Sequence, residues 1–302
     1  MDFVTILGPT ATGKTKLAAE LAYHFNGEII SADSRQVYRS MNIGTGKDYD
    51  DYLVETVKIP YHLVDVCEPT DDFSLFDFQK LFYKTFDDIA SRQKLPFLAG
   101  GTGLYLSSIL QNYKLKKAEF NSKLKSELEH KSIDELRQLL LTTSGNLHNT
   151  TDLIDKERII KAIIINQSDD EPLLRSEQLS SLVIGIAPPR SEVKNRITNR
   201  LKKRLGEGMI DEVKNLLEKG ITPERLNYFG LEYRCISLYL TGELSFNDMF
   251  QKLNSAIHNF AKRQMTWFRK MEREGVRINW FEEPDFAKTK NLVEQFFPVI
   301  KT

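Results

Sequence analysis

The clearest chemical signal in the sequence is a glycine-containing loop close to the N-terminus. Residues 8–15 read Gly-Pro-Thr-Ala-Thr-Gly-Lys-Thr and match the pattern G-x-x-x-x-G-K-[ST] without a gap. In such a loop backbone N–H groups turn inward around an anion, and the helix that follows adds partial positive charge. The pattern predicts a diphosphate or polyphosphate site, and the residues expected to hold the phosphates are Gly8, Thr10, Ala11, Thr12, Gly13, Lys14 and Thr15.

Two side chains of this loop have separate expected roles. Lys14 is expected to reach the outer phosphate, and the Thr15 hydroxyl is expected to ligate Mg²⁺ carried by the phosphates, the one metal that we propose from the sequence. The alternative is an ordinary strand–turn–helix corner with a chance lysine. The pattern does not distinguish ATP from another phosphate ester.

Polar residues follow two further apolar runs. The segment 33–36 comes after the run 28–32, and a Gly-Gly-Thr-Gly turn at 100–103 comes after the run 95–99. Because the carboxyl ends of parallel strands share one crevice, these residues are expected to face the phosphate loop. The candidates are Asp33 as a base, with Ser34, Arg35, Gln36 and Thr102 as polar contacts. The alternatives are a helix N-cap role for Asp33 and a purely structural glycine turn.

A sheet is needed to position these residues, and the apolar runs predict one. Short apolar runs at 3–7, 28–32, 61–66, 95–99 and 181–187 alternate with helical patterns such as those at 15–22 and 74–94. This alternation is typical of crossover units in a parallel sheet. We therefore predict an α/β fold, a P-loop NTPase-like, mostly parallel sheet flanked by helices.

The pattern changes after about residue 112. Lys, Glu, Leu and Ile then recur at helical spacing with few strand signals, and helical patterns dominate again after Pro189. We predict a helical insertion domain at 113–180 inside a core domain formed by 1–112 and 181–302.

Composition excludes several classes of protein. The chain has 302 residues, and its 42 Lys plus Arg balance 42 Asp plus Glu, which argues against a tail-driven nucleic-acid binder. The two cysteines, Cys67 and Cys235, lack metal-ligand spacing. No apolar run approaches the roughly 18 residues of a membrane span, and the N-terminus lacks the pattern of a signal peptide. We expect a cytoplasmic protein without a membrane partner.

Two cationic stripes with helical spacing occur in the C-terminal half. The first contains Arg196, Arg200 and Arg204, and the second contains Lys262, Thr266, Arg269 and Arg273. Such stripes fit the phosphates of a nucleic acid. The alternative is a solvated helix face with balanced ion pairs. The neighbouring Trp267 and Phe268 are more typical of a core than of a base-stacking platform.

Taken together, these segments resemble the tRNA dimethylallyltransferase family, also called tRNA isopentenyltransferases. The matching segments span nearly the whole chain in order and lie at 8–15 (GPTATGKT), 31–39 (SADSRQVYR), 42–47 (NIGTGK), 60–65 (PYHLVD), 100–105 (GGTGLY) and 261–269 (AKRQMTWFR). The insertion is only weakly matched.

The resemblance implies transfer of a dimethylallyl group from dimethylallyl diphosphate to the exocyclic amine of the adenosine immediately 3′ of the anticodon in tRNA. It implies a catalytic set of Asp33 as base, Thr102 beside the reacting groups, Lys14, and Arg200 as a diphosphate clamp. It also implies contact with the tRNA anticodon stem-loop, through the insertion domain and the residues Asp33, Ser34, Arg35, Gln36, Arg158, Lys161, Arg196, Lys262, Arg263, Gln264, Trp267 and Arg269. We expect a monomer.

This chain departs from the family pattern at three places. The sequences are Gly-Thr-Gly-Lys-Asp at 44–48, Ile-His at 257–258, and Lys-Ala-Ile-Ile at 161–164. Three other functions remain open: prenylation of free AMP, ADP or ATP, a P-loop small-molecule kinase, and a non-enzymatic RNA-binding regulator. A free nucleotide needs neither the stripes nor the insertion, and a base at Asp33 argues against a regulator.

Overall fold

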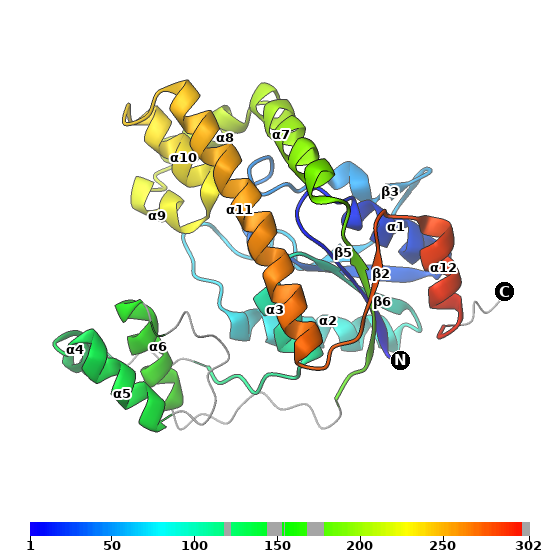
Figure 1. The fold of residues 1–302 in the computed structure, drawn as a ribbon, viewed down its shortest axis with the longest axis horizontal. Coiled ribbons are helices and arrows are strands. Elements are labelled where there is room, and N and C mark those ends of the chain that lie inside the picture. Colours follow the sequence, from blue (N-terminus) through cyan, green and yellow to red (C-terminus); the bar gives the residue numbers. More distant parts are fainter. Residues whose placement is uncertain (118–121, 144–152, 154, 168–177, 298–302) are drawn as a thin grey trace. The chain divides into compact units, whose positions relative to one another are not determined.

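The computed structural model describes residues 1–117, 122–143, 153, 155–167 and 178–297. The chain divides into two compact units, one formed by residues 1–112 and 178–302 and the other by residues 113–177 (Figure 1). This division lies within three residues of the predicted insertion, 113–180.

The larger unit is built on a parallel sheet of six strands. These are β1 (Phe3–Leu7), β2 (Gly27–Ala32), β5 (Tyr61–His62), β6 (Leu95–Gly100), β7 (Ser181–Ile186) and β8 (Ile278–Phe281), in the order β5-β2-β6-β1-β7-β8. Strands β1 and β2 are buried along their whole length, which is why their sequences read as nearly continuous apolar runs. The predicted α/β fold with a mostly parallel sheet is confirmed.

Helices cover both faces of this sheet. On one face lie α1 (Lys14–His24) and α12 (Phe286–Glu294), which pack with Val4 and Ile6 of β1. On the other lie α2 (Leu75–Ser91) and α3 (Gly103–Leu110), which pack with Phe3 and Leu7. Successive residues of a strand point to opposite faces, so a single apolar run serves both layers.

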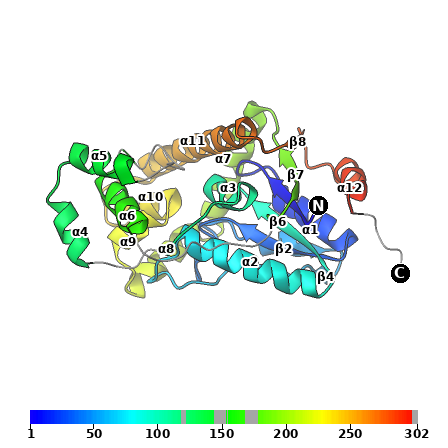
Figure 2. The same cartoon turned by 90° about the horizontal axis from the view of Figure 1, so that it is seen from below.

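A further group of helices follows β7 and forms its own core. The group consists of α7 (Arg190–Gly206), α8 (Met209–Glu218), α9 (Pro223–Tyr228), α10 (Leu231–Leu240) and α11 (Phe246–Arg273). Helix α11 belongs to two cores, because Met249 and Leu253 pack in this group while Phe268 and Met271 pack with α2 and α3. In both views α11 lies alongside α7 and its C-terminal end reaches α3 (Figure 1 and Figure 2).

The smaller unit is helical, as predicted. Helices α4 (Ser122–Glu129), α5 (Ile133–Thr143) and α6 (Lys156–Asn166) share a core that includes Leu128, Leu136 and Ile159. Arg158 and Lys161 are exposed on α6.

Three local features differ from the sequence prediction. The apolar run at 61–66 stops being a strand after His62, because Leu63 and Asp65 take left-handed φ angles of 62° and 56°. Strand β8 and a short antiparallel pair, β3 (Leu53–Val54) with β4 (Val57–Lys58) after the 3₁₀ helix η1 (Tyr49–Tyr52), were not predicted. None of these segments exceeds four residues, so periodicity gives almost no signal there. No helix among the described residues is long and apolar enough to span a bilayer.

Candidate active site

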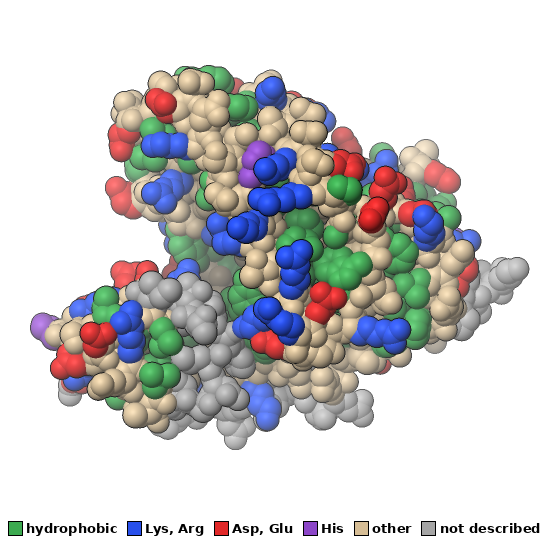
Figure 3. All heavy atoms as spheres, in the orientation of Figure 1, with side chains coloured by type: hydrophobic (Ala, Val, Ile, Leu, Met, Phe, Trp, Pro, Cys, Tyr) green, Lys and Arg blue, Asp and Glu red, His purple; other side chains and the backbone are tan. Residues whose placement is uncertain are grey.

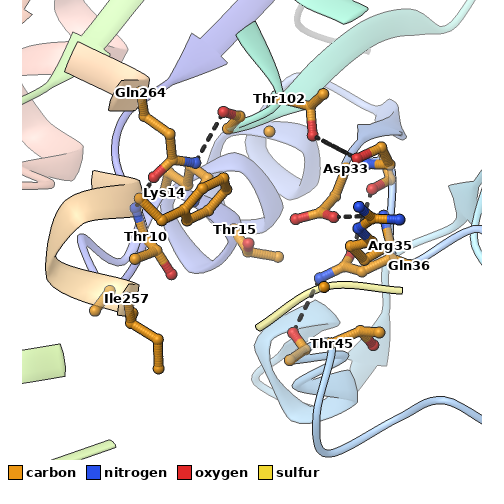
Figure 4. A pocket seen from close by; sticks show the side chains of 18 of the residues that line it. Thr10, Lys14, Thr15, Asp33, Arg35, Gln36, Thr45, Thr102, Ile257 and Gln264 are labelled. Carbon is orange, nitrogen blue, oxygen red and sulfur yellow. Dashed lines mark hydrogen bonds between the residues drawn. The ribbon is translucent and has the colours of Figure 1, made fainter. Parts of the chain in front are cut away.

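Three loops meet at one edge of the sheet because three neighbouring strands end there. Strand β6 lies between β1 and β2, and Gly100 pairs with both Leu7 and Ala32. The segments that follow these strands therefore open into one cavity of about 420 Å³. Figure 4 shows the phosphate loop on one side of this cavity and the segment 33–36 on the other. The prediction that these strand ends converge is confirmed.

The phosphate loop has the backbone that an anion site requires. Gly13 precedes α1 with a left-handed φ of 78°, a conformation that a side chain would strain. Thr12 donates its hydroxyl to the carbonyl of Pro9 at 3.0 Å, which closes the loop on itself. Lys14 and Thr15 begin the helix and line the cavity. The loop and the helix N-terminus together have the geometry that a cradle for phosphate oxygens requires.

The cavity perturbs the ionisation of Lys14. Burial lowers the pKa of its ammonium from 10.5 to about 8, and the positive charge of Arg200 acts in the same direction. Asp33 opposes this shift, so the carboxylate is close enough to interact with the lysine electrostatically. Lys14 also donates a hydrogen bond to the carbonyl of Pro9 at 3.4 Å.

Two arginines of α7, Arg200 and Arg204, line the cavity. Arg200 donates to the Thr10 hydroxyl, and burial together with Arg204 lowers the pKa of its guanidinium to about 10. Arg204 is only 7% exposed and binds both carboxylate oxygens of Asp48, at 3.1 and 2.8 Å. The expected surface stripe on α7 is therefore wrong for Arg204, which is a buried ion-pair partner. Arg196 is half-buried and pairs with Glu192 one turn earlier.

Thr102 connects the middle strand to the candidate base. Its hydroxyl oxygen accepts a hydrogen bond from the Ser34 amide at 3.0 Å, and its own amide donates to Ala32 at 3.1 Å. Asp33 accepts from the Arg35 amide at 2.9 Å, and Figure 4 shows its carboxylate directed into the cavity. The residues after Asp33 form turns, so the alternative of a helix N-cap is wrong.

The next residues along the chain attach this turn to its surroundings. Gln36 accepts from the Ser31 hydroxyl at 3.2 Å and donates to the carbonyl of Gly46 at 2.9 Å. The Arg35 guanidinium lies 5.5 Å from the ring centre of Tyr228 on α9, a cation–π distance. The turn is therefore held by contacts on both sides.

Gln264 of α11 joins two of the three loops. Its side-chain oxygen accepts from the Thr10 amide, and its side-chain nitrogen donates to the carbonyl of Gly101, both at 2.8 Å. A Cβ atom at Gly101 would lie 2.4 Å from that nitrogen, so the close approach requires glycine. Gln264, proposed from the family resemblance to contact tRNA, is 5% exposed and its amide already binds within the protein.

The outer side of α11 carries the second stripe. Lys262, Arg269 and Arg273 are exposed on this side, and within the described part of the chain none of them has an acidic partner. Arg263 is exposed too, but it lines the cavity. Figure 3 shows Lys and Arg side chains gathered along this helix. Trp267 lies half-buried on the cavity side, and a Cβ atom at Gly103 would be 2.6 Å from its side chain. Among the described residues, the positive charges of this stripe are not paired with acidic side chains, whereas Arg196 is paired with Glu192.

Several cavity residues were missed by the sequence analysis. Asp48, Asp51 and Glu232 also line the cavity, and burial raises the pKa of Asp51 and of Glu232. Glu212, on α8, binds the backbone at residues 42–44. No motif marks these acids, because each belongs to the site only through segments distant in the sequence.

The cavity fits Mg²⁺ bound with a diphosphate. Magnesium is commonly held by one or two protein oxygens together with substrate phosphates, and Thr15 offers its hydroxyl beside the phosphate loop. Among the described residues there is no cluster of three or more His, Cys, Asp or Glu that could bind a metal by itself.

A parallel sheet with a phosphate loop after β1 and a carboxylate at a neighbouring strand end defines a P-loop α/β protein with a site for a phosphorylated substrate. Comparison with known proteins gives the family. The family model described as IPP transferase matches residues 36–271, and one described as isopentenyl transferase matches residues 1–64. The chain belongs to the tRNA dimethylallyltransferase (IPP transferase) family.

Relatives and solved structures agree with this assignment. The chain is 51% identical over 285 residues to tRNA dimethylallyltransferase 1 of Azobacteroides pseudotrichonymphae, covering 93% of each chain. It is 51% identical to tRNA dimethylallyltransferase 2 of Trichlorobacter lovleyi, covering 93% and 92%. The crystal structure of the tRNA isopentenylpyrophosphate transferase of Bacillus halodurans is 32% identical, with a TM-score of 0.70 over 97% of this chain and 94% of that one.

We expect the affinity for inorganic diphosphate to respond to Lys14 ionisation. With a pKa of about 8, the ammonium is largely charged at pH 7 and roughly a tenth charged at pH 9, so affinity falls up to about tenfold between them. Calorimetric titration without metal measures this change. In the Lys14→Arg variant the side chain stays charged at both pH values. Its pH profile therefore measures how much of the change comes from titration of the diphosphate itself. Equal pH profiles for the two proteins would contradict the prediction.

Gln264→Leu is expected to lower the free energy of unfolding by about 2 kcal/mol, because a buried carbonyl and a partly buried amide of the backbone lose their partner. Urea denaturation followed by circular dichroism measures the change. Gln251→Leu is the matched control, since Gln251 is exposed on the same helix. If both variants have the stability of the unmodified protein, the amide does not join the two loops.

Proposed function

We propose that this protein transfers a dimethylallyl group from dimethylallyl diphosphate to the exocyclic amine of the adenosine 3′-adjacent to the anticodon in tRNA, releasing diphosphate. The observation that carries the proposal is the placement of the Asp33 carboxylate and the phosphate loop around one cavity. Family membership supports it, and so do the names of the relatives, which are tRNA dimethylallyltransferases. A tRNA acceptor implies a cytoplasmic enzyme.

The reaction needs a base because an adenine amine is a weak nucleophile. As the amine nitrogen bonds to the first carbon of the allylic chain, that nitrogen becomes acidic while the carbon–oxygen bond to diphosphate breaks. Asp33 would accept the released proton, a general-base role worth roughly 10² to 10⁴ in rate. Thr102 holds the backbone beside Asp33 through the Ser34 amide, which keeps the carboxylate aimed into the cavity.

The leaving diphosphate needs positive charge close to its oxygens. The amides of the phosphate loop, the Lys14 ammonium and the Arg200 guanidinium would supply it from three directions. These groups are fixed before substrate binds, and preorganised charge of this kind stabilises a transition state strongly. Mg²⁺, held by Thr15 and the diphosphate, would neutralise further negative charge.

An acceptor base in a folded tRNA must leave its stack to enter the cavity. Extrusion costs a few kcal/mol, and phosphate contacts elsewhere can offset it. The cations on the outer side of α11, Lys262, Arg269 and Arg273, have no acidic partner among the described residues and are suited to those contacts. A free nucleotide would not need them, and this observation favours tRNA over AMP, ADP or ATP as acceptor.

The proposal is tested by incubating the purified protein with Mg²⁺, radiolabelled dimethylallyl diphosphate and either tRNA or AMP. Label is expected in tRNA and not in AMP. Label in AMP alone would identify an adenylate prenyltransferase, and label in neither would contradict prenyl transfer.

Asp33→Ala is expected to reduce transfer to tRNA by at least about 10²-fold, because no base remains to take the amine proton. Diphosphate affinity, measured by calorimetry, should stay within a fewfold of that of the unmodified protein, since the phosphate loop is unaltered. Full turnover in the variant would remove Asp33 as the base.

Charge reversal distinguishes the contributions of the two cationic stripes to tRNA binding. Lys262→Glu is expected to weaken tRNA binding and to reduce the salt dependence by about one phosphate contact, because Lys262 is exposed and unpaired among the described residues. Arg196→Glu should have a smaller effect, since Glu192 already neutralises that side chain. Filter binding at several salt concentrations measures both. Lys214→Glu on α8 is the control, and equal slopes for all three variants would return the α11 stripe to ordinary solvated surface.

A further inference from the structure

Both carboxylate oxygens of Glu212 accept two hydrogen bonds each. One oxygen accepts from the amides of Asn42 and Ile43 at 2.7 and 2.8 Å. The other accepts from the Gly44 amide at 3.0 Å and from the Tyr233 hydroxyl at 2.8 Å. Three consecutive backbone N–H groups therefore converge on one carboxylate, an arrangement that normally binds a free anion.

The helices that carry Glu212 and Tyr233 also pack against the segment that Glu212 binds. Glu212 lies on α8, and Tyr233 lies on α10 and is 1% exposed. A Cβ atom at Gly44 would be 2.7 Å from the Tyr233 ring, so the segment lies directly against the tyrosine. The segment 42–46 is thus fixed to the helical layer by both a charge and a close packing contact.

The same segment forms part of the cavity wall. Gly44, Thr45 and Gly46 all line the cavity, and Figure 4 shows Thr45 beside Gln36. The carbonyl of Gly46 accepts the side-chain amide of Gln36 at 2.9 Å. Gln36 ends the turn that begins at Asp33. A direct hydrogen bond therefore links the position of the segment 42–46 to the position of that turn.

No hydrogen bond joins the segment 42–46 to the phosphate loop among the described residues. The phosphate loop is tied instead to Gln264 and Arg200. A disturbance at Glu212 therefore reaches the Asp33 side of the cavity through Gln36, while the diphosphate side keeps its own supports.

We propose that Glu212 is a positioning residue for the acceptor base: with Tyr233 it holds the segment 42–46 so that Gln36 and the turn at 33–36 face the incoming adenine. The inference rests on the proposed function. It assigns to Glu212 an effect on the nucleic-acid substrate and not on the diphosphate.

The experiment compares Glu212→Gln with Asp211→Asn, a matched loss of charge at the exposed neighbouring residue of the same helix. In Glu212→Gln the new side-chain NH₂ faces a backbone N–H, so the segment shifts. A displacement of about 1 Å near a reacting centre costs on the order of a hundredfold, which we expect as a loss in kcat/KM for tRNA. The affinity for inorganic diphosphate, measured by calorimetry, should change less than about twofold.

Two further variants keep the test decisive if Glu212→Gln folds poorly. Tyr233→Phe removes one of the four hydrogen bonds and should give a smaller loss in kcat/KM for tRNA, again with unchanged diphosphate binding. Glu212→Asp keeps the charge and should recover part of the activity lost in Glu212→Gln.

The outcomes separate the inference from the proposed function. If the unmodified protein does not label tRNA, the proposed function fails whatever the variants do. If it labels tRNA and Glu212→Gln retains its kcat/KM, the positioning role is overturned. Equal losses in tRNA turnover and diphosphate affinity would also overturn it, because they indicate a general loss of structure.

Discussion

The proposed reaction requires a carboxylate beside a site for a highly charged anion, and these two groups repel each other. The structure resolves this conflict by placing cations between and around them. Lys14 interacts with Asp33, and Arg200 approaches the phosphate loop through Thr10. Burial lowers the pKa of Lys14 and of Arg200, so keeping these two groups charged costs free energy. A diphosphate would relieve that cost, because its charge compensates theirs where water is largely excluded.

The fold brings the phosphate loop and Asp33 close together through short connections. Adjacent parallel strands deliver the phosphate loop, the threonine turn and the aspartate to one level of the sheet. Gln264 then joins the phosphate loop to the turn, and Thr102 joins the turn to the residue after Asp33. The separation of the phosphate loop and Asp33 is therefore set by hydrogen bonds to the backbone and not by flexible side chains alone, which is the kind of rigidity that the proposed transfer needs.

The parts of the site that could be predicted are those formed by residues that follow one another in the sequence. The phosphate loop, Asp33 and Thr102 each follow an apolar run, and parallel topology brings such ends together. Arg204 was misassigned to a surface because its partner, Asp48, is 156 residues away. Gln264 was expected to contact tRNA and Glu212 was not singled out, because the roles of both depend on backbone groups that no residue type reveals. Long-range hydrogen bonds to the main chain carry no compositional signature.

The span of these contacts has a consequence for biosynthesis. The phosphate loop leaves the ribosome well before α11, yet its amide at Thr10 is bonded to a residue 254 positions later. The side chain of Thr5, in the central strand, is bonded to Ser181, 176 positions later. Forming such distant pairs is slow, since long loops must close first. The phosphate loop of the nascent chain therefore lacks the support of Gln264 until α11 has emerged.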